Sequence, residues 1–476
     1  MARRSDNPGP RPRGGPPRRI LAVIGAGASG TLTAAHVLRA SRGAWRVVLI
    51  DREGHGTGVA YSTCDPRHLL NVQAGCMSAF DDEPDGFLRW CADRGHNAKA
   101  TDYLPRRLYG AYLQDLLRRF AAPASLELVR KQAVALSLSG GRRPLVVTLA
   151  DATTINADAA VLALGNASPA PIGAGTSIPR VIADPWRPSA LAPVQGAKRV
   201  LVAGMGLTAV DVTLSITAAC EATEVIAISR HGRLPQAHLA PVAPSAARSE
   251  PTLRFDDTPV TLDLIAGHVG EAIRANPAGW RDVVDSLRPQ TTSLWRALSL
   301  DERRRFMGEL KWLWDLHRHR MAPAVAAEIN ELREQGRMRL EQGAVTAARA
   351  TPGGVRVELH TDGGRRVLDA DWLVNATGPA GGLPASDDLL VRQLLTDQLA
   401  CGDELGIGFA CDDDGELLGE GHGGNGRIYT LGPPRRGELL ESTAIPEIRG
   451  QAAAISRALL AHAGDRKRLQ AAIAAR

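Results

Sequence analysis

Apolar runs of strand length alternate with helix-like segments in two separate parts of this chain. Residues 19–30 form a β-branched run that ends in a glycine-rich turn, residues 31–40 place apolar side chains at helical spacing, and residues 46–51 form a second apolar run. Residues 199–231 repeat this order of strand, turn, helix and strand. Strands that alternate with helices predict an α/β fold with parallel sheets, here built from two Rossmann-like units.

The turn of the first copy has the spacing of a dinucleotide site. Gly25, Gly27 and Gly30 form a G-x-G-x-x-G pattern between strand and helix. The first glycine permits a tight turn, the second lets the backbone approach a pyrophosphate, and the third lets the helix pack closely on the strand. Asp51 ends the second apolar run 21 residues after Gly30, where it is placed to accept a hydrogen bond from an adenosine ribose.

The second copy differs at the end of its second strand. Gly204, Gly206 and Ala209 give G-x-G-x-x-A, and the following strand runs into Arg230 instead of an acid. A guanidinium pairs with a 2′-phosphate, which a carboxylate would repel, so this unit is predicted to prefer NADPH to NADH. An ordinary surface arginine is the alternative, because one side chain decides little.

Each copy is followed by a similar series of strands. Residues 126–150 and 338–360 alternate around glycine turns, which predicts a β-meander after each unit. Each series closes on an aspartate, an apolar run and a small-residue turn, which ends at Gly165 and Gly378 respectively. Because such a closing strand returns the chain to the dinucleotide, both glycines are candidate FAD-site residues. The duplication predicts a glutathione-reductase-like architecture.

A helical insertion interrupts the second unit between about residues 245 and 335, where the strand pattern is lost. Asp301 is placed to cap one of its helices. Such an insertion is a natural lid over a substrate cleft, which makes Arg318 and Arg320 candidates for binding a substrate carboxylate or a cofactor phosphate. The alternative is a positive helix C-terminus before Pro323, stabilised by the helix dipole.

These patterns predict a disordered basic tail at residues 1–19, an FAD-binding domain at 20–185 and 372–476, and an NADP-binding domain at 186–371 that holds the insertion. No metal site is predicted, because His317 and His319 stand two positions apart and point to different faces of a helix.

The charge and the cysteine content limit which binding partners and which cellular compartment we expect for this protein. The net charge is +6, and the predicted tail supplies five of these charges, so the remaining chain is nearly neutral. A neutral body argues against a nucleic-acid or membrane partner and leaves a homo-oligomer open. The six cysteines include no C-x-x-C pair, which favours reduced thiols in the cytoplasm and argues against dithiol-reductase chemistry.

Several further stretches resemble known flavoproteins. The closing segments resemble a signature of the two-dinucleotide flavoproteins that include lysine and ornithine N-hydroxylases and flavin-containing monooxygenases. From about residue 20 to the C-terminus the chain is more closely similar to a bacterial FAD/NAD(P)-binding family, in the stretches GVAYST, HLLNV, LPRRLYGAYL, WDLHRHRMAP and LGPPRRG.

The resemblance implies that FAD lies on the first unit. It continues the nucleotide cradle through Gly56, Thr57 and Gly58 and brings Asn71 near the flavin ring. It also implies that the segment from Gly432 to Thr443 leads to a helix whose N-terminus points at the flavin. Simple capping of that helix by its Ser-Thr pair is the alternative.

The resemblance further implies an FAD-dependent oxidoreductase that NADPH reduces, a monooxygenase that uses O₂ to hydroxylate a nitrogen or other soft nucleophile of a small molecule. The F-x-G-x-x-x-H fingerprint of flavin-containing and Baeyer–Villiger enzymes is missing, since IADPWRP stands in its place. Two alternatives stay open: an NAD(P)H dehydrogenase that passes electrons to a small acceptor, and a flavin-binding sensor without turnover. The sequence identifies neither the catalytic residue nor the substrate.

Overall fold

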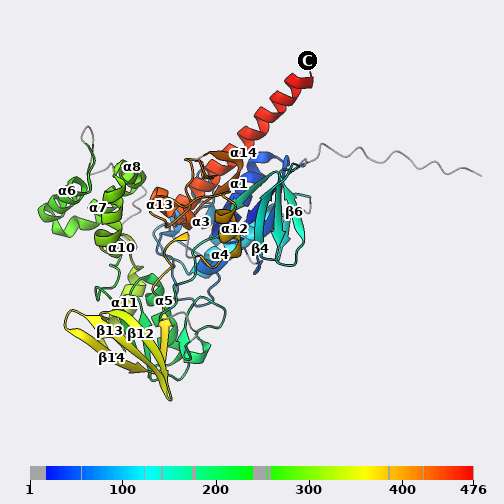
Figure 1. Cartoon of the computed structure of the whole chain (residues 1–476). Helices are drawn as coiled ribbons and strands as arrows, with labels where there is room; N and C mark the ends of the chain where they lie inside the picture. Colours follow the sequence, from blue (N-terminus) through cyan, green and yellow to red (C-terminus); the bar gives the residue numbers. More distant parts are fainter. Residues whose placement is uncertain are drawn as a thin grey trace, which may run out of the picture.

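The computed structural model describes residues 18–54, 56–122, 124–140, 143–173, 178–239, 253, 255, 259–383, 386–421 and 423–474. Two sheets, one parallel and one parallel except for its edge strand β16, carry helices on their faces and confirm the predicted α/β fold; we call the parts built on them the first and second units (Figure 1). The predicted tail lies outside the described residues up to Pro17, but Arg19 belongs to a strand and not to the tail, because it pairs in register with Trp45.

The first sheet has six strands in the order β16-β17-β7-β1-β2-β3. Strand β1 (Arg19–Ile24) lies between β2 (Trp45–Ile50) and β7 (Ala159–Leu162) and is parallel to both. The carboxyl end of β1 is therefore a switch point, where open α/β sheets bind their ligands. The remaining strands are β3 (Leu126–Val129), β16 (Glu416–Leu418) and β17 (Gly424–Thr430).

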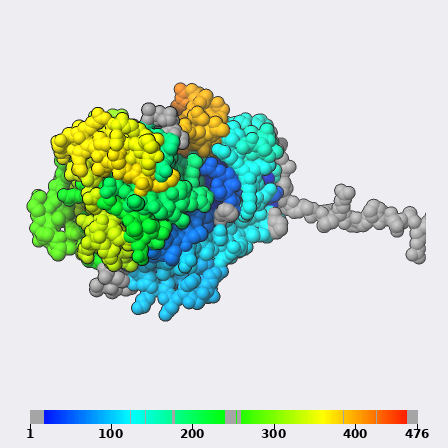
Figure 2. Space-filling model, turned by 90° about the horizontal axis from the view of Figure 1, so that it is seen from below, coloured from blue at the N-terminus to red at the C-terminus, as the bar shows by residue number. Residues whose placement is uncertain are grey.

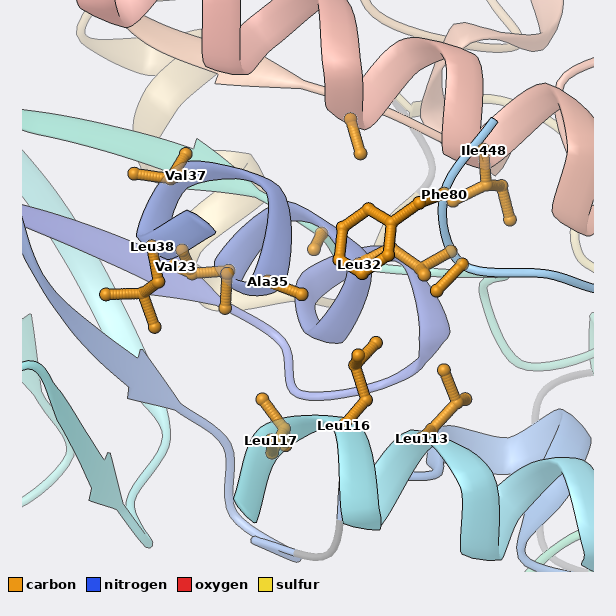
Figure 3. Packing of buried hydrophobic residues seen from close by; sticks show 14 of the residues in the cluster. Val23, Leu32, Ala35, Val37, Leu38, Phe80, Leu113, Leu116, Leu117 and Ile448 are labelled. Carbon is orange, nitrogen blue, oxygen red and sulfur yellow. The ribbon is translucent and has the colours of Figure 1, made fainter. Parts of the chain in front are cut away.

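Helix α1 (Ala28–Ser41) lies at the centre of the core on one face of this sheet. It packs between α4 (Arg106–Arg119) and α14 (Ile445–Ala474), and Figure 3 shows Leu32 and Phe80 on the side of α14 and Leu116 on the side of α4. Most side chains of α1 are buried, so its packing leaves little freedom to shift the N-terminus of the helix.

The second sheet repeats this arrangement with five parallel strands in the order β11-β10-β9-β15-β8. Helix α5 (Leu207–Ala219) follows the central strand, as α1 does in the first unit. The strands are β8 (Val181–Ile182), β9 (Arg199–Ala203), β10 (Glu224–Ser229), β11 (Met338–Gln342) and β15 (Trp372–Asn375).

Each unit carries a separate antiparallel sheet of three strands, which confirms the predicted meanders. Figure 2 shows the second of these sheets, in yellow, on one side of the molecule and the first, in cyan, on the other. Their strands are β4 (Ala133–Leu138), β5 (Leu145–Leu149), β6 (Thr154–Ala157), β12 (Ala344–Thr351), β13 (Gly354–Thr361) and β14 (Gly364–Ala370).

The two aspartates that precede the closing strands have equivalent partners. Asp158 accepts a hydrogen bond at 2.8 Å from the backbone N–H of Ile20, at the start of β1. Asp371 accepts hydrogen bonds at 2.6 Å and 2.9 Å from the backbone N–H groups of Lys198 and Arg199, at the start of β9. Each carboxylate thus joins the closing strand of its unit to the central strand.

The insertion is helical, as predicted; most of its helices stand to one side of both units in Figure 1, whereas α11 packs on the second unit. Trp295 is buried, and its indole N–H donates at 2.7 Å to the carbonyl of Gly437 in α13 (Arg436–Leu439), so the insertion docks on the last part of the chain. Its helices are α6 (Leu262–Ala275), α7 (Trp280–Ser286), α8 (Thr291–Ala297), α9 (Leu300–Arg305), α10 (Lys311–Arg318) and α11 (Pro323–Glu334).

Three local expectations are corrected. Strands β8 and β15 both belong to the second sheet, although the predicted boundaries placed them with the FAD-binding domain. Hydrogen bonding across the sheet assigns them there, and the sequence pattern of a short strand does not reveal its partner. Ser299, and not Asp301, caps α9, because its hydroxyl accepts from the N–H of Glu302 and Glu302 bonds back to Ser299 in a capping box.

Among the described residues, no helix combines the length and the apolar character that a bilayer-spanning segment needs.

Candidate functional site

Both glycine turns are closed by the same backbone contact. Gly25 and Gly204 have φ angles of +103° and +114°, in the region that favours glycine. A Cβ on Gly25 would lie 2.2 Å from the carbonyl oxygen of Ala163, and a Cβ on Gly204 would lie 2.2 Å from that of Ala376. These alanines directly follow the closing strands β7 and β15. Each closing strand therefore presses on its turn so closely that a side chain has no room.

The helices that follow the turns begin at glycines, which have no side chain to cap them. Gly27 is the N-cap of α1, Gly206 is the N-cap of α5, and neither first turn contains an acidic residue. The first N–H groups of a helix have no partner within it, and with the helix dipole they attract an anion. Both helix ends therefore fit the pyrophosphate of a dinucleotide.

The third position of each motif lies against the turn. A Cβ on Gly30 would lie 1.9 Å from the carbonyl oxygen of Gly25, so any side chain would push α1 away from β1. Ala209, at the equivalent position of α5, is fully buried, and its methyl group is accommodated there.

Two other predicted glycines meet the N-terminus of α1. Gly58, the first residue of α2 (Gly58–Tyr61), lies so close that its Cβ would be 2.8 Å from the Cα of Gly27. Gly432 has a φ of +76°, and its Cβ would be 2.8 Å from the hydroxyl of Ser29. Segments far apart in the sequence thus form a backbone cradle at one helix end, which fits the diphosphate of FAD.

Asp51 holds the first glycine turn in shape. Its Oδ2 accepts from the N–H of Ala26 at 2.7 Å, and its Oδ1 accepts from the N–H of Glu53 at 2.8 Å. A carboxylate accepts about four hydrogen bonds, so Asp51 retains lone pairs for a ribose hydroxyl. The ribose contact stays a prediction.

At the equivalent point of the second unit, Arg230 is exposed just after β10 and forms no ion pair with any described residue. The neighbouring His231 stacks on Trp312 of α10, with ring centroids 3.9 Å apart and planes inclined by 14°. The loop that would meet the adenosine end of NADPH therefore touches the helical insertion. A free guanidinium there fits a 2′-phosphate.

Arg318 and Arg320 are not free to bind a substrate, which corrects the expectation from the sequence. Arg318 donates to Glu441 at 2.8 Å, and both side chains are almost buried. Arg320 is 3% exposed and forms a bidentate pair with Asp285 at 2.7 Å and 3.0 Å. No local sequence pattern marks these carboxylates, because each lies far along the chain from its arginine.

The segment around Asn71 contacts the second unit. His238 donates from Nε2 to the carbonyl of Asn71 at 3.1 Å, and its ring lies 5.1 Å from that of Tyr103. Burial, with a contribution from the nearby charge of Arg320, lowers the pKa of His238 to about 4. His238 is thus a neutral link between the units, which sequence reasoning missed. The predicted contact between Asn71 and the flavin stays a prediction.

The remaining candidates lie at strand and helix ends. Gly165 follows β7 and Gly378 follows β15, with φ angles of +69° and +88°. Thr443 is exposed two residues before α14. The hydroxyl of Ser442 is buried and makes no hydrogen bond to the described protein, so it does not cap α14.

The part of the chain that the structure describes contains no group of three or more histidine, cysteine, aspartate or glutamate side chains that could hold a metal ion.

Comparison with known proteins agrees with this geometry. Residues 22–167 match the family model for FAD-NAD(P)-binding. No curated protein sequence matches the chain.

Solved structures share the fold over nearly the whole chain. The reduced form of ornithine hydroxylase from Pseudomonas aeruginosa has a TM-score of 0.64 at 16% identity, with 94% of this chain and 99% of that one covered. The ornithine N-hydroxylase of Kutzneria sp. 744, with reduced FAD, NADP⁺ and L-ornithine, gives 0.63 at 16% identity, over 95% and 100% of the two chains. Bacillithiol disulfide reductase from Bacillus cereus gives 0.54 at 14% identity, over 94% and 100%.

We expect Gly25→Ala to abolish FAD binding, because the methyl group would collide with the Ala163 carbonyl and displace the turn. Absorbance of the purified protein near the flavin bands measures bound FAD. Gly43→Ala is the matched control: Gly43 also has a positive φ, of +87°, but its Cβ would meet nothing within 4 Å. It should cost about 1–2 kcal/mol of stability and keep the flavin. Equal FAD content in both variants would contradict the role of the contact.

We also expect a pH dependence of stability from His238. Its ordinary pKa of 6.5 applies in the unfolded chain, and the folded value is about 4, so the unfolded state binds the proton more readily between these values. Stability is therefore fully present above pH 6.5 and falls as the pH drops toward 4.

His238→Gln should reduce this loss by an amount on the order of 2 kcal/mol, measured by urea unfolding at several pH values. The same substitution at His360, an exposed histidine of β13, should leave the parent profile unchanged. If His238→Gln lost stability with falling pH as the parent does, His238 would not be the cause of that loss.

The family match gives FAD and NAD(P) as the dinucleotides, and together with the fold it supports an oxidoreductase that uses both. Residues 22–167 thus match an FAD-NAD(P)-binding family, within a chain that shares its fold with the ornithine hydroxylases.

Proposed function

We propose that this chain is an FAD-dependent monooxygenase that NADPH reduces and that hydroxylates a nitrogen, or another soft nucleophile, of a small molecule. The observation that carries the proposal is the duplicated glycine turn. Each turn faces an uncapped helix N-terminus, and both stand in one chain with the fold of the ornithine hydroxylases. A chain that bound FAD alone would have no use for the second turn.

The protein residues act chiefly by binding and orienting. The N-terminus of α1, with Gly58 and Gly432 against it, would hold the FAD diphosphate, and the N-terminus of α5 with Arg230 would hold NADPH. When bound, FAD would supply the redox chemistry, namely a site that takes up a hydride and reactivity toward O₂ in the reduced state. Hydride transfer needs no protein acid or base, so positioning is the main contribution of the chain to that step.

The second candidate is a reductase that passes the electrons to an acceptor other than O₂. The shared fold with bacillithiol disulfide reductase favours it. Against disulfide chemistry, all six cysteines are free thiols, and the sequence places none of them in a close pair. The fate of the electrons after flavin reduction distinguishes the two candidates.

We expect NADPH to reduce the bound flavin faster than NADH does, measured by anaerobic stopped-flow bleaching. Arg230→Ala should weaken NADPH binding about tenfold and leave NADH unchanged, because only the 2′-phosphate loses a charged partner. The control is Arg339→Ala, an exposed arginine of β11 that pairs with Glu224. An unchanged preference in Arg230→Ala would remove Arg230 from the site.

We expect NADPH oxidation in air to yield a hydroxylated amine when a suitable primary amine is present. Ornithine, lysine and a diamine without a carboxylate form the first panel. Mass spectrometry detects an amine that has gained one oxygen atom, and the amount of this product is compared with the amount of hydrogen peroxide formed. NADPH consumption that a quinone or disulfide accelerates, with no hydroxylated product from any amine, would favour the reductase.

A further inference from the structure

A buried cluster of polar side chains joins the two dinucleotide units. We call it the interface cluster and define it as Asp65, His68 and Arg106 of the first unit with Asp211 and Ser215 of α5. Figure 2 shows the first unit, in blue, directly against the green segments of the second. The cluster lies at such a contact and includes none of the residues assigned above to cofactor binding.

Arg106 and Asp211 form its charged pair. Their side chains are 14% and 5% exposed, and Nη2 of Arg106 lies 2.9 Å from Oδ2 of Asp211. Nε of the same guanidinium donates at 3.1 Å to the carbonyl of Leu69. Burial raises the pKa of Asp211, while the charge of Arg106 opposes this effect.

His68 lies at the centre of the hydrogen-bonded part of the cluster. Its Nδ1 lies 2.7 Å from the hydroxyl of Thr63, and its Nε2 lies 2.9 Å from the hydroxyl of Ser215 and 3.0 Å from the carbonyl of Asp211. Ser215 donates its own proton to Asp65 at 3.1 Å. Nε2 therefore carries the ring proton, because both of its neighbours must accept. Ser215 of α5 thus accepts from Nε2 of His68 and donates to Asp65, so hydrogen bonds tie α5 to the first unit at this point.

The cluster connects the two helix ends that would hold the dinucleotides. Asp211 stands about 7 Å along α5 from its N-cap glycine, at a rise of ~1.5 Å per residue. On the other side, Arg106 is the first residue of α4, which packs against α1. A continuous series of contacts thus runs from one N-terminus to the other through α5, the cluster, α4 and α1.

Stability alone does not account for the charged pair. A buried ion pair is often no more stabilising than apolar side chains of similar volume, because desolvation offsets the attraction. An apolar contact would hold the units together, but it would tolerate sliding and rotation. A directional polar contact restricts both.

We propose that the interface cluster is a positioning element, which sets α5 so that the nicotinamide of NADPH meets the flavin at hydride-transfer distance. This inference rests on the proposed NADPH reduction of FAD and names the residues that align it. The cluster members are positioning residues, since they act through α5 and do not touch either cofactor.

The test is the double variant Arg106→Met/Asp211→Leu, which replaces the charged pair by apolar side chains. We expect it to fold with the flavin content and thermal midpoint of the parent. At saturating NADPH, however, anaerobic flavin reduction should slow by about tenfold or more, while the NADPH concentration at half-maximal rate changes less than about threefold. Reduction by dithionite, which bypasses the second unit, should keep the parent rate.

The matched control is Arg337→Met. Arg337 is a half-buried arginine that donates at 2.8 Å to the carbonyl of Thr217, so it also contacts α5 but lies within the second unit. It should leave the reduction rate unchanged. If the double variant loses FAD or unfolds, Ser215→Ala decides the matter, and we expect a rate reduction of about threefold at parent stability.

If NADPH reduced the flavin of the folded double variant, or of Ser215→Ala, as fast as it reduces the flavin of the parent, the inference would be overturned. An equal loss in Arg337→Met would also overturn it, because disturbance of α5 would then suffice. If NADPH fails to reduce the parent enzyme itself, while dithionite succeeds, the proposed function fails and not only the positioning role.

Discussion

At each glycine turn a backbone carbonyl occupies the space that a side chain would need. The carbonyls of Ala163 and Ala376 come from the closing strands, and each lies 2.2 Å from the Cβ that its glycine lacks. This contact fixes the glycine turn against the closing strand. The position of the turn then sets where the following helix begins. Because that helix start presents unpaired N–H groups, the anion site of each unit depends on the approach of two backbones. The matched aspartates Asp158 and Asp371 support the approach from the other end of the same strands.

Contacts between the parts of the molecule include ion pairs that are at least partly buried. Arg318 and Glu441 join the insertion to the segment before α14, and Arg288 joins it to Glu447 in the first turn of α14 at 2.7 Å. Buried charges of this kind add little net stability, but they cost much if either partner is left alone. They therefore favour one arrangement of the parts over others. An enzyme that must bring two cofactors face to face needs such an arrangement more than it needs extra stability.

The duplicated architecture also separates the tasks of the chain. The two glycine turns fit the diphosphates of two dinucleotides, while the helical insertion contacts both units. Its Trp312 stacks on the loop after β10, and its Trp295 docks on α13. The insertion therefore contacts the second unit through one tryptophan and the last part of the chain through the other.

The sequence by itself determined the two units, the glycine turns, the meanders, the helical nature of the insertion and the matched aspartates. All of these follow from local spacing, because turn residues and the periodicity of apolar residues can be recognised within short stretches of the sequence. The tertiary structure alone decided the pairing of β8 and β15, the cap at Ser299, the partners of Arg318 and Arg320, and the interface cluster around His68. Each of these joins residues through hydrogen bonds or charges that no periodic pattern encodes. Which partner is reached depends on how the apolar surfaces of the sheets and helices pack, and only the folded chain settles that.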